Sequence, residues 1–196
     1  MSQAKKELRA EVIARRDAID ERERERRSAE ACAQLVAAIE TLGTTRPLVA
    51  LYSHMGSEVQ LDALVRAADE RGWRLCFPAM LATSEAEAPM AFFQASATDA
   101  LERRAFLGSQ LKRYTVRELT EEFPLVAPEE IDAMVAPLVA FDSNRMRMGY
   151  GGGNYDRYLP QLREDALVVG VGFAEQQVDA VPTEPHDLPL PQIVVA

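Results

Sequence analysis

A glycine-rich segment with charged and aromatic neighbours is the part of this sequence best suited to chemistry. Four of the ten glycines lie between positions 149 and 153, and Arg147 precedes them. Glycine at this density indicates turns with positive φ, or a backbone that a ligand must approach closely. Backbone N–H groups at such a turn, with the start of a following helix, can bind phosphate. The guanidinium of Arg147 would add a permanent positive charge at the rim.

Two familiar phosphate-binding motifs do not fit this segment. A P-loop requires Lys and then Ser or Thr after its last glycine, whereas Asn154 and Tyr155 follow here. The dinucleotide motif GxGxxG would require glycine at position 154. A glycine-rich surface turn without a ligand stays open as an alternative, but the flanking Arg147, Tyr150 and Asp156 favour a binding loop.

Apolar periodicity predicts the elements that position this segment. An almost unbroken apolar run over 133–141 predicts a buried strand before it. The i, i+3, i+4, i+7 spacing of apolar and aromatic residues over 155–162 predicts a helix after it. Similar patterns predict helices over 3–18, 22–42 and around 61–68. They predict strands over 48–52, 74–77, 166–173 and 192–195, the second of these stopped by Pro78, and a short edge strand over 90–93.

These elements predict a single domain over residues 1–196 of the α/β class. We expect an open, mostly parallel three-layer sheet with helices on both faces and an N-terminal helical arm. Ligands of such sheets bind at the carboxyl ends of the strands. The loops over 53–58 and 147–156 both follow predicted strands, so we expect them to face one crevice. Residues 81–130 give mixed signals, and the alternating Glu and Arg over 21–27 predict a solvated helix face with weak ion pairs.

The composition is that of an ordinary globular protein. The 196 residues are 47% hydrophobic and 27% charged, with a formal net charge of −9. An acidic chain is a poor non-specific binder of nucleic acid or anionic membranes, so we expect neither as a partner. The N-terminal residues do not resemble a signal peptide, and no apolar run reaches membrane-spanning length. We expect a cytoplasmic monomer.

Cysteine and histidine form no recognisable metal or redox motif. Cys32 and Cys76 fall in a predicted helix and a predicted strand, without a CxxC pair. This pattern predicts two buried, reduced thiols. His54 and His186 are too few for a histidine-based metal site.

Four separated pieces of the sequence resemble the 5-formyltetrahydrofolate cyclo-ligases, also called methenyltetrahydrofolate synthetases. The pieces are Lys5-x-x-Leu8-Arg9, Glu58, the run 137–142 with the glycine-rich segment after it, and His186-Asp187 after Val181-Pro182. The resemblance spans nearly the full chain. It implies ATP- and magnesium-dependent conversion of 5-formyltetrahydrofolate to 5,10-methenyltetrahydrofolate, with release of ADP and phosphate, on a three-layer open sheet.

The resemblance also implies roles for individual residues. Arg147 and Tyr150 would be catalytic. ATP would contact the first helix and the glycine-rich segment through Lys5, Lys6, Glu7, Leu8, Arg9, Arg147, Met148, Gly149, Tyr150, Gly151, Gly152, Gly153, Asn154 and Tyr155. A solvated helix face is the alternative interpretation for Lys5 and Arg9.

Folate and magnesium would bind nearby. The resemblance implies that the substrate contacts Ser53, Glu58, Tyr150, Gly151, Gly152, Gly153 and Asn154. A carboxylate such as Glu58 can accept two N–H donors from the pterin edge. Asp156 and Asp187 would ligate Mg²⁺, which prefers oxygen ligands. Asp156 and Glu58 also suit helix N-termini, where a carboxylate is favoured, and that interpretation stays open.

The implied chemistry is phosphorylation of the formyl oxygen followed by ring closure. Such a reaction requires positioning and charge neutralisation rather than a nucleophilic side chain. The sequence departs from the family pattern at Asn154, where Tyr is usual, and at Met148, where Leu is common. A Gly-x-x-Glu-Pro segment is not recognisable over 108–128. Two alternatives stay open: a relative that binds nucleotide and folate without turnover, and a sugar-phosphate enzyme on a similar sheet.

Overall fold

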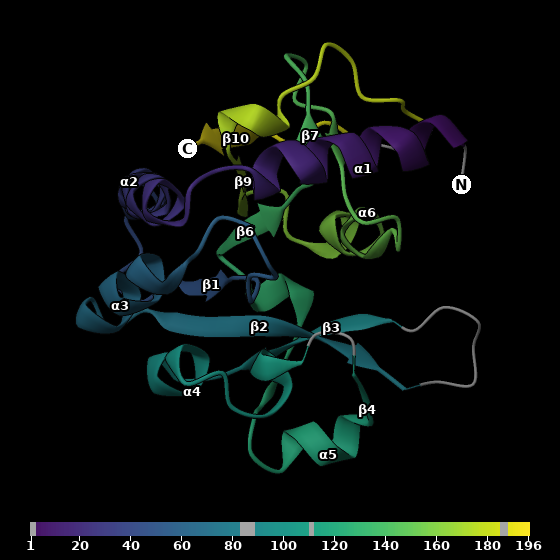
Figure 1. The fold of residues 1–196 in the computed structure, drawn as a ribbon. Coiled ribbons are helices and arrows are strands. Elements are labelled where there is room, and N and C mark those ends of the chain that lie inside the picture. Colours follow the sequence, from purple (N-terminus) through teal and green to yellow (C-terminus); the bar gives the residue numbers. More distant parts are fainter. Residues whose placement is uncertain (1–2, 83–88, 110–111, 185–187) are drawn as a thin grey trace.

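The computed structural model describes residues 3–82, 89–109, 112–184 and 188–196. Its main sheet runs in the order β10-β9-β6-β1-β2-β3-β5, with β4 paired to β2 (Figure 1). Neighbours from β10 to β2 are parallel, whereas the β2–β3 and β3–β5 pairs are antiparallel. The strands are β1 (Leu48–Ala50), β2 (Arg74–Leu81), β3 (Met90–Gln94), β4 (Arg113–Tyr114), β5 (Leu125–Val126), β6 (Ala133–Pro137), β9 (Leu167–Gly172) and β10 (Gln192–Val195).

Helices cover both faces of this sheet, as expected. Alternate side chains of a strand point to opposite faces, and β1 illustrates this: Val49 packs in the larger core with α2 and α3, while Leu48 and Ala50 join Tyr158 of α6 on the other face. The α-helices are α1 (Gln3–Asp17), α2 (Glu21–Glu40), α3 (Asp62–Glu70), α4 (Ala97–Leu101), α5 (Val116–Thr120) and α6 (Asn154–Tyr158). Short 3-10 turns are η1 (Ala105–Gly108), η2 (Pro128–Glu130), η3 (Leu159–Gln161) and η4 (Ala174–Gln176).

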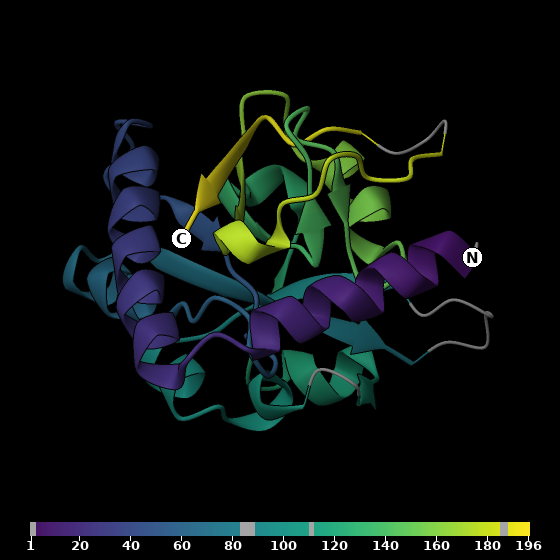
Figure 2. The ribbon, with the colours of Figure 1, turned by 45° about the horizontal axis from the view of Figure 1, so that its top comes forward.

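The N-terminal helix is packed against the domain along most of its length. Val12 of α1 is fully buried in a small core with Val139, Ala140 and Met148. Figure 2 shows α1 lying across the front of the domain. The predicted helical arm is therefore a part of the folded body that lies beside the glycine-rich segment.

The predicted strand over 133–141 is divided in two. β6 ends at Pro137, and β7 (Ala140–Phe141) pairs with β8 (Arg147–Met148) in a separate antiparallel hairpin. The buried carboxylate of Asp142 holds the hairpin turn, since Oδ1 accepts from the Asn144 and Met146 N–H groups at 2.9 and 3.1 Å. The strand before the glycine-rich segment is therefore β8 of this hairpin, a feature that an apolar run cannot show.

Three further expectations are corrected. Pro78 lies inside β2 and does not end it. On one side of β2 the pairing with β1 ends at Cys76 and the pairing with β4 begins at Met80, so a proline at position 78 removes no ladder hydrogen bond on that side. β3 is covered by β5 and is not an edge strand. The helix over 155–162 is short, because α6 ends at Tyr158 and a 3-10 turn containing Pro160 follows it.

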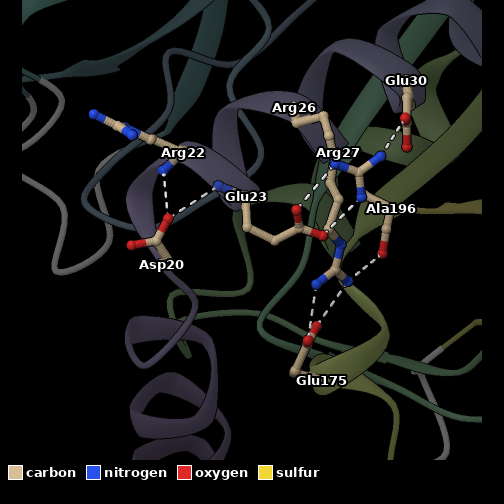
Figure 3. Close-up of polar contacts among 8 residues, drawn as sticks. All are labelled: Asp20, Arg22, Glu23, Arg26, Arg27, Glu30, Glu175 and Ala196. Carbon is tan, nitrogen blue, oxygen red and sulfur yellow. Dashed lines mark hydrogen bonds and ion pairs between the residues drawn. The ribbon is translucent and has the colours of Figure 1, made fainter.

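The charged start of α2 is only partly a solvated face (Figure 3). Arg26 forms exposed ion pairs with Glu23 and Glu30, as predicted. Arg27 instead binds both carboxylate oxygens of Glu175 at 2.8 Å and a terminal oxygen of Ala196, with its side chain 13% exposed. Arg27 therefore fastens α2 to the C-terminal end of the chain.

Two properties follow directly from the burial of the elements. Cys32 and Cys76 are buried and free, as predicted, and burial raises the pKa of Cys32 to about 11. Of the helices in the described ranges, none combines the length and the apolar character required to cross a membrane.

Candidate functional site

The glycine loop, residues 149–153, connects β8 to α6. Gly151 and Gly153 have φ of 99° and 62°, values that side chains with a Cβ rarely adopt. Gly153 is also the N-cap of α6. The predicted positive-φ turn is therefore confirmed. Because α6 is only five residues long, the predicted binding of phosphate would rest on the loop amides more than on a long helix dipole.

Arg147 lies under the glycine loop and not at its rim. The residue is 8% exposed, and its Nη2 donates to Asp156 Oδ1 at 2.6 Å. Its guanidinium carbon is 5.9 Å from the centre of the Tyr155 ring. The Nε atom is buried and has no hydrogen-bond partner among the described residues. Arg147 is thus a preoriented cation with one donor still available.

The inward face of α1 carries cationic side chains to the same loop. Arg9 is buried, and its Nε donates to the Gly149 carbonyl at 2.9 Å. Lys5, one turn earlier, pairs with Glu184 of the C-terminal segment at 3.0 Å. Lys6 and Glu7 are exposed, whereas Leu8 packs in the small core behind α1. The structure therefore brings Arg9 to the glycine loop, pairs Lys5 with the C-terminal segment, and leaves Lys6 and Glu7 in solvent.

Glu58 is a buried acid on the opposite side of the site. It is 4% exposed, and its Oε2 accepts from the Met55 N–H at 2.8 Å. Burial raises the pKa of Glu58, against the opposing effects of the Met55 N–H, Arg16 and the Tyr150 hydroxyl. Its Oε1 is buried and accepts no hydrogen bond from the described part of the chain. Glu58 therefore offers an acceptor that the fold itself leaves unused.

Arg16 connects this acid to the glycine loop. Its Nε donates to Ser57 Oγ at 2.8 Å and its Nη2 donates to the Tyr150 hydroxyl at 3.1 Å. The 53–58 and 147–156 loops, which were expected to face one crevice, are therefore joined through Arg16. Arg16 was not among the predicted site residues, although its spacing carries a signal: Arg9, Val12 and Arg16 recur at i, i+3, i+7, which places them on one helical face.

The remaining residues of the glycine loop vary in exposure. Tyr150 is 43% exposed, and burial of its hydroxyl end next to Glu58 raises its pKa. Asn154 is held from two sides, since its Oδ1 accepts from Arg157 at 2.9 Å and its Nδ2 lies 3.5 Å from Met80 Sδ. The Tyr155 hydroxyl is buried without a hydrogen-bond partner in the described ranges. The glycine loop thus exposes the Tyr150 side chain, and Asn154 at the start of α6 is held in place.

Two cavities adjoin these groups. Ser53 and His54 line a small cavity of about 20 Å³ that also touches Asp62 and Arg103. A second, more apolar groove of about 170 Å³ lies beside Arg147 and Asp156. Its lining residues are Arg147, Asp156, Leu159, Pro160, Val168, Leu188, Pro189, Leu190 and Pro191. The proline-rich tail therefore forms a wall of the site, which its composition alone did not indicate.

Of the two predicted magnesium ligands, the structure describes Asp156 and not Asp187. Asp156 is on α6 and pairs with Arg147. Asp187 and the neighbouring His186 lie outside the described residues. Within the described ranges, no group of three or more His, Cys, Asp or Glu side chains is placed to hold a metal ion. The magnesium site stays a prediction.

Known proteins resemble this chain in sequence and in fold. A Haemophilus influenzae protein named 5-formyltetrahydrofolate cyclo-ligase is 45% identical over 67 residues, and the match covers 34% of this chain and 36% of that relative. The match thus spans about a third of the length of that curated relative. A 5,10-methenyltetrahydrofolate synthetase from Mycoplasma pneumoniae has a similar fold, with a TM-score of 0.72 at 24% identity over 97% of both chains.

A second solved structure agrees. The 5,10-methenyltetrahydrofolate synthetase of Aquifex aeolicus matches with a TM-score of 0.69 at 25% identity, covering 98% of this chain and 90% of that one. The sequence profile of the 5-formyltetrahydrofolate cyclo-ligase family matches residues 1–196. A match across the whole chain, on a fold shared with proteins of this name, establishes the relationship. The chain belongs to the 5-formyltetrahydrofolate cyclo-ligase family.

Proposed function

We propose that this protein converts 5-formyltetrahydrofolate to 5,10-methenyltetrahydrofolate, using ATP and Mg²⁺ and releasing ADP and phosphate. One observation carries the proposal: two successive residues of the glycine loop contact the two halves of the site. The Gly149 carbonyl binds Arg9 of α1, and the Tyr150 hydroxyl binds Arg16 beside Glu58. An anion-binding half and a half with a free buried acceptor therefore meet at one loop.

The anion-binding half suits a nucleotide. Arg9 and Arg147 supply positive charge beside the glycine loop, and Arg147 is paired with Asp156, in a chain whose net charge is −9. The loop amides add donors that a phosphate can accept from. The groove beside Arg147 and Asp156 is mostly apolar, with three of its lining residues proline, and would contact the apolar faces of a nucleoside.

Mg²⁺ fits the donor chemistry of this half. Asp156 presents a carboxylate that is 30% exposed, and Asp187 would supply a second one. When bound, Mg²⁺ would neutralise charge on the phosphates. Arg147 would hold the transferring phosphoryl group beside it, since its Nε is a buried donor with no partner among the described residues.

The acceptor half suits a pterin. Glu58 Oε1 is a buried acceptor, and a pterin edge carries N–H donors that would satisfy it. In the reaction, the γ-phosphoryl group is transferred to the formyl oxygen. N10 then forms a bond to the formyl carbon and loses its proton, while the C–O bond breaks and phosphate leaves. Tyr150 would lie between the two substrates, because it projects from the loop that both halves contact.

The test is turnover with both substrates. We expect ADP release that depends on 5-formyltetrahydrofolate, accompanied by the absorbance of the methenyl product. Binding of both ligands without ADP release would identify a binding protein and contradict this proposal. A single domain over residues 1–196, a monomeric state and a cytoplasmic location remain parts of the same proposal.

A further inference from the structure

Arg16 is a buried charged side chain at the junction of three segments. It is 3% exposed, and its guanidinium donates to Ser57 Oγ at 2.8 Å and to the Tyr150 hydroxyl at 3.1 Å. Ser57 belongs to the 53–58 loop and Tyr150 to the glycine loop. Ser57 Oγ in turn donates to Asp17, the last residue of α1. One guanidinium therefore joins α1 to both loops of the site.

The bonding of Arg16 is incomplete for a residue with a purely structural role. Both of its hydrogen bonds go to hydroxyl groups and neither goes to a carboxylate. Its Nη1 is buried without a partner among the described residues, as is Oε1 of Glu58. Both residues line one narrow gap between α1 and the sheet, which is too small to hold a water molecule. A buried, partly unsatisfied guanidinium is unfavourable for stability, so another reason for its position is required.

Arg16 shares a rigid element with the anion-binding half of the site. Arg9, Val12 and Arg16 are all buried, on one face of α1. Arg9 contacts the glycine loop at Gly149, while Arg16 contacts it at the next residue, Tyr150. A movement of α1 or of the glycine loop at Arg9 would therefore also change the contacts of Arg16 with the Tyr150 hydroxyl and with Ser57. Tyr150 is 43% exposed, and its hydroxyl interacts with the Glu58 carboxylate as well as with Arg16, so the three side chains form one cluster.

We propose that Arg16 is a positioning residue that couples nucleotide binding to folate binding. This inference rests on the proposed function of the two halves. A nucleotide that fixes Arg9 and the glycine loop would also fix Tyr150 and the 53–58 loop through Arg16. Less conformational freedom is then lost when folate binds, so each ligand increases the affinity for the other.

The experiment measures the dissociation constant of 5-formyltetrahydrofolate by calorimetry, with and without a saturating non-hydrolysable ATP analogue and Mg²⁺. We expect the analogue to lower this constant about tenfold in the natural protein. In Arg16→Gln the ratio should fall to about twofold or less, a reduction within the size range of such coupling. The affinity for the analogue alone should remain close to that of the natural protein. Loss of the ratio at constant nucleotide affinity is a result that mere destabilisation would not produce.

Arg15→Gln is the matched control. Arg15 is exposed, precedes Arg16 on the same helix and carries the same charge, so this variant should keep the full ratio. Tyr150→Phe removes only the hydroxyl acceptor and tests the bridge even if Arg16→Gln folds poorly. The double variant should then lose no more of the ratio than either single variant, because both changes break one connection.

Three results would overturn the inference: a full ratio in Arg16→Gln or Tyr150→Phe, an equal loss in Arg15→Gln, or no coupling in the natural protein. Failure of the proposed function is a different result. A natural protein that binds neither ligand, or binds both without turnover, contradicts that function, whereas turnover with uncoupled binding contradicts only the role of Arg16.

Discussion

Arg147 and Asp156 form an ion pair with each other, with Nη2 2.6 Å from Oδ1, although each has a ligand of its own in the proposed function. Arg147 is expected to hold phosphate oxygens and Asp156 to hold Mg²⁺. The Arg147 side chain is 4% exposed, so Asp156 neutralises a buried charge in the unliganded chain. We expect the two side chains to exchange partners when a magnesium–nucleotide complex binds, because that complex carries both charges.

Asp156→Asn should separate the two roles of this carboxylate. The Mg²⁺ concentration for half-maximal activity should rise at least about tenfold, because a neutral amide is a weaker ligand of a hard cation. The free energy of unfolding should fall by about 1–3 kcal/mol, because Arg147 loses its charged partner. A magnesium titration and urea unfolding measure the two effects. Asp165→Asn, at a side chain that is 80% exposed, is the control; unchanged magnesium dependence in Asp156→Asn would exclude the metal role.

Arg9→Ala should weaken the binding of ATP more than the binding of folate. Its Nε holds the Gly149 carbonyl, and its charge lies at the anion-binding half. A hydrogen bond that involves a charged group contributes about 1.5–3 kcal/mol, so the KM for ATP should rise at least about tenfold. Steady-state kinetics with each substrate varied gives the comparison. Lys6→Ala, on the exposed side of the same helix, should leave both KM values near those of the natural protein. Equal rises in both KM values for Arg9→Ala would place Arg9 outside the nucleotide half.

Glu58→Gln should increase the stability of the folded chain at neutral pH and weaken the binding of folate. Burial raises the pKa of Glu58 above its ordinary value of 4.5. The folded state therefore holds this proton more tightly than the unfolded state, and stability falls as the pH rises from about 4.5 through the folded pKa. Glutamine removes that pH dependence. Between pH 4.5 and pH 7 the free energy of unfolding of the variant should therefore rise relative to that of the natural protein, as measured by urea unfolding at both pH values.

The same variant should bind folate poorly, because an amide offers one acceptor oxygen instead of two. The KM for 5-formyltetrahydrofolate should rise while that for ATP stays near its natural value. A variant with normal folate KM would show that Glu58 serves only the 53–58 loop, through its bond to the Met55 N–H.

Asn154→Tyr should improve folate binding without changing the chemical step. An added aromatic face contributes about 0.5–1.5 kcal/mol beyond area burial, so the KM for 5-formyltetrahydrofolate should fall several-fold with kcat nearly constant. The substitution also removes the contacts of Asn154 with Arg157 and Met80, so unfolding must be measured beside the kinetics. A natural protein without turnover, restored by Asn154→Tyr, would support the binding-only alternative.

The sequence by itself determined the elements whose signals are local. Spacing of apolar residues located α1, α2, α3, β1, β9 and β10 to within a few residues. Glycine density located the loop with positive φ at Gly151 and Gly153. Such features depend on neighbours within a turn or a strand, so a reading along the chain is sufficient.

Only the tertiary structure decided which charged residues are buried and what they contact. Arg16 and Arg147 have partners 134 and 9 residues away in the chain, and arginine is expected in solvent by default. The division of the 133–141 run depends on a hairpin turn held by Asp142, and the place of Pro78 depends on where β1 and β4 end. Each of these outcomes is set by contacts between distant segments, which fix burial and pairing together and which no local pattern contains.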